Sequence, residues 1–171
     1  METENSESRE FQDGFVNLRR YNNETDPEKL IVYLYDKMNT NEGLQQLRDS
    51  DTRFLKRKNL EVRFVAEFKG ELIASLELNN EYWNKEGFHM YSVVTAPQFR
   101  GTGISQMLFQ YVCRWVKGQG KKLITTDTYG DNIRAQAFFQ KIGFTQFGII
   151  PSLIENTEGN KVDQIFYYIT L

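Results

Sequence analysis

The residues best suited to chemistry lie between positions 93 and 105, where the chain reads VVTAPQFRGTGIS. A run of β-forming residues followed by the apolar helical pattern that starts at Ile104 predicts a strand, a turn and a helix start. The first N–H groups of a helix lack internal partners and carry partial positive charge, so consecutive amides at that point bind anions. Gly101 and Gly103 let the backbone approach a diphosphate closely, and Arg100 adds a charged donor. We interpret the segment as an anion-binding turn; the alternative is a tight connection that only requires glycine.

Groups that could transfer a proton flank this turn in the sequence. Glu77 and Glu81 lie on or just past the preceding strand, where a carboxylate could accept a proton through water. His89 begins the strand that leads into the turn, and it ranks below Glu77 because an isolated histidine is more often structural. Tyr129 and Tyr91 are phenols that could donate a proton. Exposure or packing is the structural alternative for each of these side chains.

Composition limits the other kinds of site. With 21 basic and 23 acidic side chains among 171 residues, the net charge of −2 gives no broad positive field for nucleic acid or an anionic membrane. One cysteine, Cys113, and one histidine cannot make a disulfide or a zinc cluster, so we expect no metal. The chain lacks an apolar run of about 20 residues, and its first ten residues lack the layout of a secretion signal. We therefore expect a cytoplasmic protein.

The elements that position these groups follow from hydrophobic periodicity. Residues 1–13 are polar and predict a flexible leader, and residues 14–171 predict a single domain. The pattern favours an α+β fold, in which a central mixed, mostly antiparallel twisted sheet of about seven strands is flanked by about four helices. Strands are expected at 15–22, 61–68, 71–79, 88–95, 122–128, 144–150 and 162–171, and helices at 27–38, 42–47, 131–142 and from 103 up to 118. We expect residues 49–59 and 151–161 to be polar connections.

Two motifs together resemble a known family. The segment from Pro97 to Ile104 resembles the Q/R-x-x-G-x-G/A signature of the GNAT N-acetyltransferase superfamily, with Gln98, Gly101 and Gly103 at its fixed positions. A second segment resembles that family's N-x-x-A-x-x-F-Y-x-x-x-G-F motif in order and spacing, through Asn132, Ala135, Phe138, Phe139, Gly143 and Phe144. With its flanking strands and helices, the chain is similar to the family fold over nearly its whole length. It departs from the pattern at Phe139, where members commonly carry the tyrosine that protonates the departing thiolate.

The resemblance implies acetyl-CoA as co-substrate, bound in a splayed cleft between the fourth and fifth predicted strands. It implies that the pantetheine arm pairs with the backbone around Val93 to Thr95, and that an amide near Val94 stabilises the oxyanion. The cofactor-binding residues implied in this way are Val93, Val94, Thr95, Gln98, Phe99, Arg100, Gly101, Thr102, Gly103, Ile104, Ser105, Asn132, Ala135, Phe138 and Phe139.

The function expected from the resemblance is transfer of an acetyl group to a primary amine of a small molecule or peptide, by direct attack in a ternary complex. The expected catalytic groups are the Glu77 carboxylate as base, the Tyr129 hydroxyl as acid and the Val94 amide. Because Phe139 replaces the usual tyrosine, a non-catalytic acyl-CoA-binding or sensing domain stays open as an alternative, as does an interaction protein that keeps only the fold. The identity of the amine is not encoded in a readable pattern. We expect a monomer or a homodimer, the latter if Val162–Leu171 is an exposed edge strand.

Overall fold

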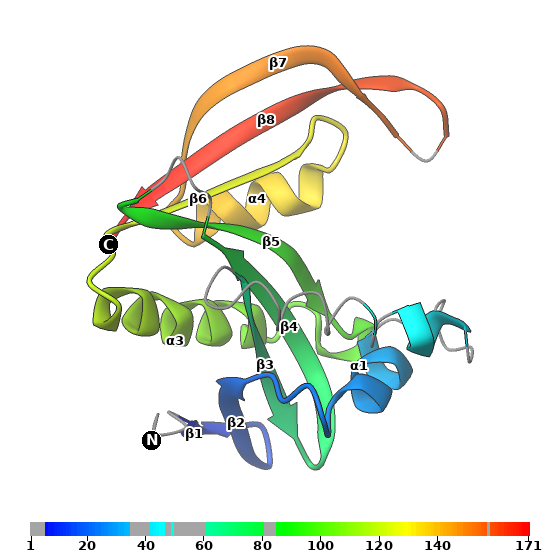
Figure 1. Ribbon diagram of the computed structural model, residues 1–171, viewed down its shortest axis with the longest axis vertical. Helices are drawn as coiled ribbons and strands as arrows, with labels where there is room; N and C mark the ends of the chain where they lie inside the picture. The colour runs from blue at the N-terminus through cyan, green and yellow to red at the C-terminus, as the bar shows by residue number, and fades with distance from the viewer. Residues whose placement is uncertain (1–5, 35–41, 47–48, 50–60, 81–84, 157) are drawn as a thin grey trace.

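The computed structural model describes residues 6–34, 42–46, 49, 61–80, 85–156 and 158–171. Within that part of the chain, one eight-stranded sheet has the strand order β1-β2-β3-β4-β5-β6-β8-β7 (Figure 1). Its strands are β1 (Glu7–Phe11), β2 (Gly14–Arg20), β3 (Glu61–Phe68), β4 (Glu71–Asn79), β5 (Gly87–Thr95), β6 (Leu123–Tyr129), β7 (Thr145–Glu155) and β8 (Lys161–Thr170). The helices are α1 (Pro27–Leu34), α3 (Ile104–Gly118) and α4 (Ile133–Lys141); a 3-10 turn covers Pro97–Phe99, and residues 42–46 are also helical. The β5–β6 pair is parallel and the other recorded pairs are antiparallel, which confirms the predicted α+β fold.

Helices cover both faces of the sheet, as neighbouring residues of β3 show. Val65 belongs to a small apolar cluster with Leu30 of α1, whereas the next residue, Ala66, belongs to the large core that includes α3. Because successive residues of a strand point to opposite faces, α1 packs on one face and α3 on the other. Helix α4 lies on the α3 side, where Phe139 packs against Tyr167 of β8 (Figure 1).

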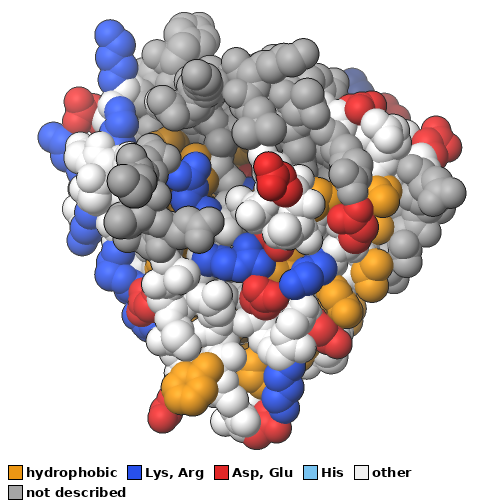
Figure 2. Space-filling view, turned by 60° about the horizontal axis from the view of Figure 1, so that its bottom comes forward, with side chains coloured by type: hydrophobic (Ala, Val, Ile, Leu, Met, Phe, Trp, Pro, Cys, Tyr) orange, Lys and Arg blue, Asp and Glu red, His pale blue; other side chains and the backbone are white. Residues whose placement is uncertain are grey.

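A chain of ion pairs ties α1 to β2 and β3. Arg19 Nη1 lies 2.6 Å from Asp26 Oδ2 and Arg19 Nη2 lies 2.8 Å from Glu67 Oε2, while Lys29 Nζ lies 2.9 Å from Glu67 Oε1. Burial raises the pKa of Glu67, but hydrogen bonds from Lys29 and Arg19 outweigh burial and leave that pKa below its ordinary value. Figure 2 shows basic and acidic side chains lying beside one another over one face of the molecule.

The expectation of a flexible leader over residues 1–13 is wrong for Glu7–Phe11, which form β1 and pair with β2. This strand also raises the strand number from the predicted seven to eight in the described part of the chain. The average polarity of the leader hides an alternation in which Phe11 is buried and packs edge-on against Phe68, with ring centroids 5.3 Å apart. Glu7 bonds to Arg114 of α3, which fixes the other end of the strand.

Two expectations at the C-terminal end are also corrected. Strand β7 runs on to Glu155, so 151–155 is not part of a connection, and its pairing with β8 shifts between Ile150 and Ile154. Pro151 falls inside this irregular stretch, where a residue without an N–H group is tolerated. Strand β8 is not an edge strand, because it pairs with β6 on one side and β7 on the other. Some predicted features lie outside the described residues, namely the C-terminal ends of two expected helices (35–38 and 47), the stretch 50–59 and Glu81.

The sheet forks between β5 and β6. The two strands pair from Gly87 with Leu123 up to Met90 with Thr126, and the recorded pairing stops there (Figure 1). Beyond that rung β5 stays with β4 through Thr95, and β6 stays with β8 through Tyr129. A positive φ of 51° at Ser92 and a register shift in β4 accompany the change of direction. The predicted splay between the fourth and fifth strands of the sequence assignment is therefore present, between β5 and β6.

Candidate active site

The glycine turn enters α3 directly after β5. Gly101 and Gly103 have φ angles of 80° and 89°, a region that costs side-chain-bearing residues energy. A Cβ built at either glycine meets no atom of the described residues within 4 Å beyond its own chain neighbours, so the described part of the chain leaves this side of the turn open. Gly103 is the N-cap of α3 and supplies no side-chain cap, which leaves the amides of the first helical turn for another acceptor. The turn has the form that a diphosphate-binding helix start requires.

Hydrogen bonds hold the turn against the end of β5. The Arg100 Nε donates to the Thr95 carbonyl oxygen at 3.2 Å, and the Thr95 and Ser105 hydroxyls bond to each other. The Thr102 hydroxyl donates to the Phe99 carbonyl oxygen at 2.7 Å. The backbone of Val93 to Thr95 and the start of α3 are thereby fixed relative to each other, as a site for one long ligand needs.

Helix α4 begins on the other branch of the fork, just after β6. The Asn132 side chain caps it by accepting from the Ala135 N–H at 3.2 Å. Phe138 is half-buried next to Ala135 on the border of the core. The second predicted motif thus lies across the fork from the glycine turn, which places the two motifs on opposite sides of one opening.

Three of the predicted cofactor residues direct their side chains into the core. Phe99 packs on Phe68 with ring centroids 6.0 Å apart, and Ile104 is 1% exposed. Phe139 is 5% exposed and contacts Tyr167, with ring centroids 5.5 Å apart. At Phe99 and Ile104, the backbone and not the side chain is therefore available to the turn. The Phe139 ring packs between α4 and β8.

The structure places the two predicted catalytic side chains in different settings. Glu77, on β4, is buried, and its Oε1 lies 2.8 Å from Arg63 Nη2 and 2.9 Å from Arg63 Nε. Tyr129 is the last residue of β6 and is 40% exposed, on the branch of the fork that leads to α4. Glu77 is thus engaged by a guanidinium group, whereas Tyr129 stands at an accessible edge.

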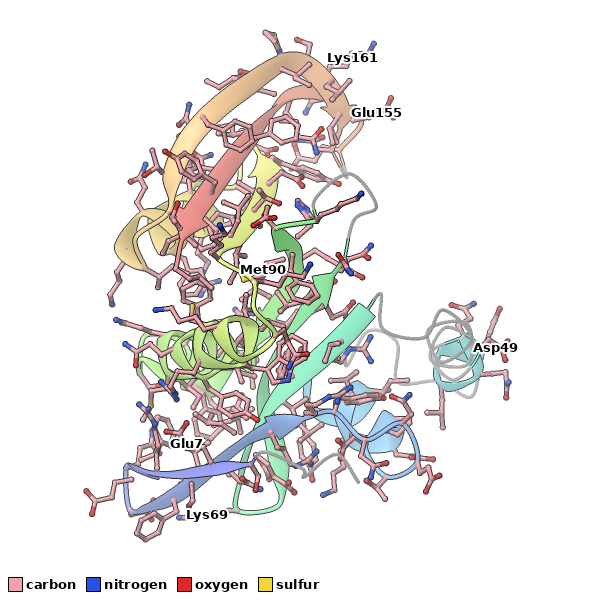
Figure 3. The ribbon with its side chains drawn as sticks, turned by 60° about the vertical axis from the view of Figure 1, so that its left-hand side comes forward. Glu7, Asp49, Lys69, Met90, Glu155 and Lys161 are labelled. Carbon is pink, nitrogen blue, oxygen red and sulfur yellow. The ribbon has the colours of Figure 1, made fainter. Side chains whose placement is uncertain are left out.

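His89, which ranks below Glu77 on sequence alone, lies at the fork with partners that sequence reasoning missed. His89 Nε2 lies 3.0 Å from Asp127 Oδ1, and His89 Nδ1 lies 3.0 Å from Thr125 Oγ1. The Gln164 amide donates to Asp127 Oδ2 at 2.7 Å, and Tyr91 stacks on the imidazole. Figure 3 labels Met90, on the last paired rung beside this group. The available signal was Asp127 itself, a charged residue inside an otherwise neutral strand sequence.

The sequence profile of the acetyltransferase (GNAT) family matches residues 14–144, which include β2 to β6, both motifs and the fork. The chain belongs to the GNAT family. A search of curated protein sequences gives no match.

Solved structures of GNAT acetyltransferases share the fold at low sequence identity. The ribosomal-protein-S5-alanine acetyltransferase from Vibrio fischeri is 18% identical, with a TM-score of 0.76 over 96% of each chain. The spermidine/spermine N-acetyltransferase from Vibrio cholerae is 19% identical, with a TM-score of 0.71 over 91% of this chain and 92% of that one. A protein described as a streptothricin acetyltransferase from Bacillus anthracis, solved with acetyl coenzyme A, is 19% identical, with a TM-score of 0.59 over 67% of this chain and 64% of that one.

The Bacillus anthracis structure contains acetyl coenzyme A, and the glycine turn of this chain has the form that the diphosphate of such a ligand requires. The open side of Gly101 and Gly103 and the uncapped start of α3 suit a diphosphate, and beyond Met90 the side of β5 that faces β6 has no recorded strand partner among the described residues. Among the described residues, no group of three or more His, Cys, Asp or Glu side chains could hold a metal ion. In the same part of the chain, no helix has the length and hydropathy of a membrane span.

Proposed function

We propose that this GNAT protein transfers an acetyl group from acetyl-CoA to a primary amine by direct attack in a ternary complex. The fork carries the proposal, because it opens between the glycine turn on one branch and the α4 motif on the other. A thioester in this opening would be reached from the sheet face opposite α3, where polar side chains of β5 and β6 gather. Two substrates can then meet from opposite faces without crossing each other.

The backbone supplies most of the binding in this proposal. The amides of Gly101 and of Gly103 to Ser105 hold the diphosphate, because those of Phe99, Arg100 and Thr102 already donate to backbone carbonyls. The backbone of Val93 to Thr95 pairs with the pantetheine arm in place of a neighbouring strand. Asn132, Ala135 and Phe138 line the other branch. The Val94 amide donates to the oxyanion, and a donor of this kind contributes about 3 to 4 kcal/mol to the barrier reduction.

Proton transfer is needed on both sides of the reaction. A lysine-like amine with a pKa of about 10.4 is about 0.04% neutral at pH 7, so the acceptor must lose a proton before it attacks. The sequence pattern assigned the acceptance of this proton to Glu77. Because Glu77 Oε1 is engaged in the ion pair with Arg63, we assign Glu77 the positioning of Arg63 instead. Tyr129, exposed at the end of β6, is the proposed donor to the departing thiolate in place of the tyrosine that Phe139 replaces.

The acceptor class rests on the chemistry of the site and on similar folds. The names of two structures with the same fold specify spermidine or spermine and an alanine of a ribosomal protein as acceptors, and these carry amines. We therefore propose a primary amine of a small molecule or peptide for this chain. A non-catalytic acyl-CoA-binding domain is the second candidate, and the phenylalanine at position 139 is the observation that favours it.

Mass spectrometry of a panel of polyamines, amino acid amides and N-terminal peptides incubated with acetyl-CoA tests the enzyme. We expect a product heavier by one acetyl group for at least one acceptor, and none with Gly101→Glu, whose carboxylate would repel the diphosphate. Calorimetry of acetyl-CoA binding to wild type and to Gly101→Glu separates the enzyme from the non-catalytic binding domain. Binding without any product across the panel would favour the second candidate, and binding that survives Gly101→Glu would overturn the assignment of the turn.

A further inference from the structure

The contacts of His89 cross the fork at its base. His89 lies on the rung with Thr125, one step before the last paired rung, and Asp127 lies one step beyond that rung on β6. The imidazole bridges the two through its two ring nitrogens, each at 3.0 Å from its partner. The His89 side chain is 19% and the Asp127 side chain 25% exposed, so neither is sealed in the core.

We propose that His89 is the general base of the reaction, that it receives the proton of the acceptor ammonium through the Thr125 hydroxyl, and that Asp127 positions its ring. The proposal rests on the acetyltransferase function proposed above. It assigns the acceptor side of the site to β5 and β6, on the face opposite α3.

The two ring nitrogens have different tasks in this arrangement. The Nε2–H donates to the Asp127 carboxylate, which fixes the neutral tautomer with its basic nitrogen at Nδ1. The Thr125 hydroxyl both donates and accepts, so it can pass its hydrogen to Nδ1 as it accepts one from the amine or from a bridging water. The resulting imidazolium is stabilised by the adjacent carboxylate.

Neighbouring side chains hold His89 and Asp127 in place and favour the ionised form of the Asp127 carboxylate. The hydrogen bond with His89 lowers the pKa of Asp127 and outweighs the opposing effect of burial, and the bond from Gln164 lowers it further. Tyr91 stacks on the imidazole with ring centroids 6.4 Å apart and planes 24° apart. A ring held on both nitrogens and one face is preorganised for a single proton path.

The proton and electron balance follows directly. The ammonium loses one proton to His89, and the neutral nitrogen then forms a C–N bond to the thioester carbonyl carbon. The C–S bond breaks with its electron pair on sulfur, and the thiolate takes up one proton from Tyr129. The second nitrogen proton passes to water as the amide forms, and Tyr129 regains a proton from water. The proton held by His89 returns to solvent after the product leaves.

Acceptors of different basicity distinguish this role from a structural one. The steady-state rates of wild type, His89→Gln, Thr125→Val and Thr125→Ser are compared with an alkylamine and with an aromatic amine that is already neutral at neutral pH. We expect His89→Gln and Thr125→Val to lower kcat for the alkylamine on the order of 100-fold or more, and to change the aromatic amine little. Thr125→Ser retains the hydroxyl and should stay close to wild type.

Controls separate this proposal from the proposed function. Asn79→Ala alters the residue that faces His89 from β4 and should leave both rates unchanged. Thermal melting and acetyl-CoA calorimetry check that each variant is folded and binds co-substrate. If wild type acetylates neither these amines nor any acceptor of the panel above, the proposed function is wrong; if wild type is active and His89→Gln keeps its alkylamine rate, or loses both rates equally, the base assignment is overturned.

Discussion

Replacing the turn glycines by alanine separates their conformational role from their binding role. Gly101, Gly103 and Gly120 have φ angles of 80°, 89° and 71°, and within the part of the chain that the structure describes a Cβ at each meets nothing within 4 Å beyond its chain neighbours. The first two precede α3 in the proposed diphosphate turn, and the third follows the C-terminal end of the same helix. Gly120→Ala is therefore a matched control, with similar backbone strain and no expected ligand nearby.

The expected magnitudes follow from this geometry. With no clash to relieve, each substitution costs the strain of a left-handed alanine, about 1 to 2 kcal/mol. For a chain of this size, the melting temperature of the unliganded protein should fall by about 2 to 8 °C in all three variants. Acetyl-CoA at about 1,000 times its Kd should stabilise wild type and Gly120→Ala by about 4 kcal/mol, and each tenfold loss of affinity in Gly101→Ala or Gly103→Ala removes about 1.4 kcal/mol of that.

Thermal unfolding with and without acetyl-CoA, supported by calorimetric Kd values, gives both quantities in one series. We expect the three unliganded variants to melt together and the ligand-induced shift to drop only for the two turn variants. An equal ligand-induced shift in all three would refute the placement of the diphosphate. A much larger loss of unliganded stability in the turn variants would instead refute the reasoning that their open side faces no protein atoms.

Three further predictions concern stability. Gly87→Ala should destabilise the fold by about 3 kcal/mol or more in urea unfolding, because its Cβ would lie 2.1 Å from the Leu123 carbonyl oxygen at the first rung of the β5–β6 pairing; wild-type stability would contradict that register. Tyr167→Phe should raise the melting temperature by a few degrees, because the Tyr167 hydroxyl is buried and has no hydrogen-bond partner among the described residues, whereas the exposed Tyr168→Phe should change little; a fall specific to Tyr167→Phe would show that the hydroxyl has a partner. Glu67 has a lowered pKa in the folded state, so its contribution is complete above the unfolded value of about 4.3 and is lost as pH falls through the folded value. The difference in free energy of unfolding between wild type and Glu67→Gln should therefore be constant at neutral pH and shrink in acid, and a difference that persists at low pH would mean that charge is not its source.

Much of this fold was predictable from local signals in the sequence. The Lys69-Gly70 pair predicts the β3–β4 turn, and both residues take the positive φ angles, 51° and 85°, that such a hairpin turn needs. The apolar stripe from Ile104 predicts α3, and the glycine turn and Asn132 are found at the helix starts that the motifs imply. These features depend on residues close together in the chain.

The parts that were missed depend on partners far away in the sequence. The β1 strand is polar on average and is held by Phe68 and Arg114, which no local pattern pairs with it. Glu77 pairs with Arg63 and His89 pairs with Asp127, in each case across neighbouring strands of the folded sheet. Pairing of this kind is set by register, and register is known only once the sheet is assembled.

The fork also divides the molecule into two units that need not open together. One unit holds β1 to β5 and the other β6 to β8 with α4, and the direct strand pairing between them spans four rungs, from Gly87 with Leu123 to Met90 with Thr126. Native-state hydrogen exchange should then show the β6–β8 amides opening as a separate cooperative unit in the unliganded protein. A co-substrate that bonds to β5 and α4 at once would merge the two units, so its binding should slow exchange on both sides of the fork, far from the atoms that it touches.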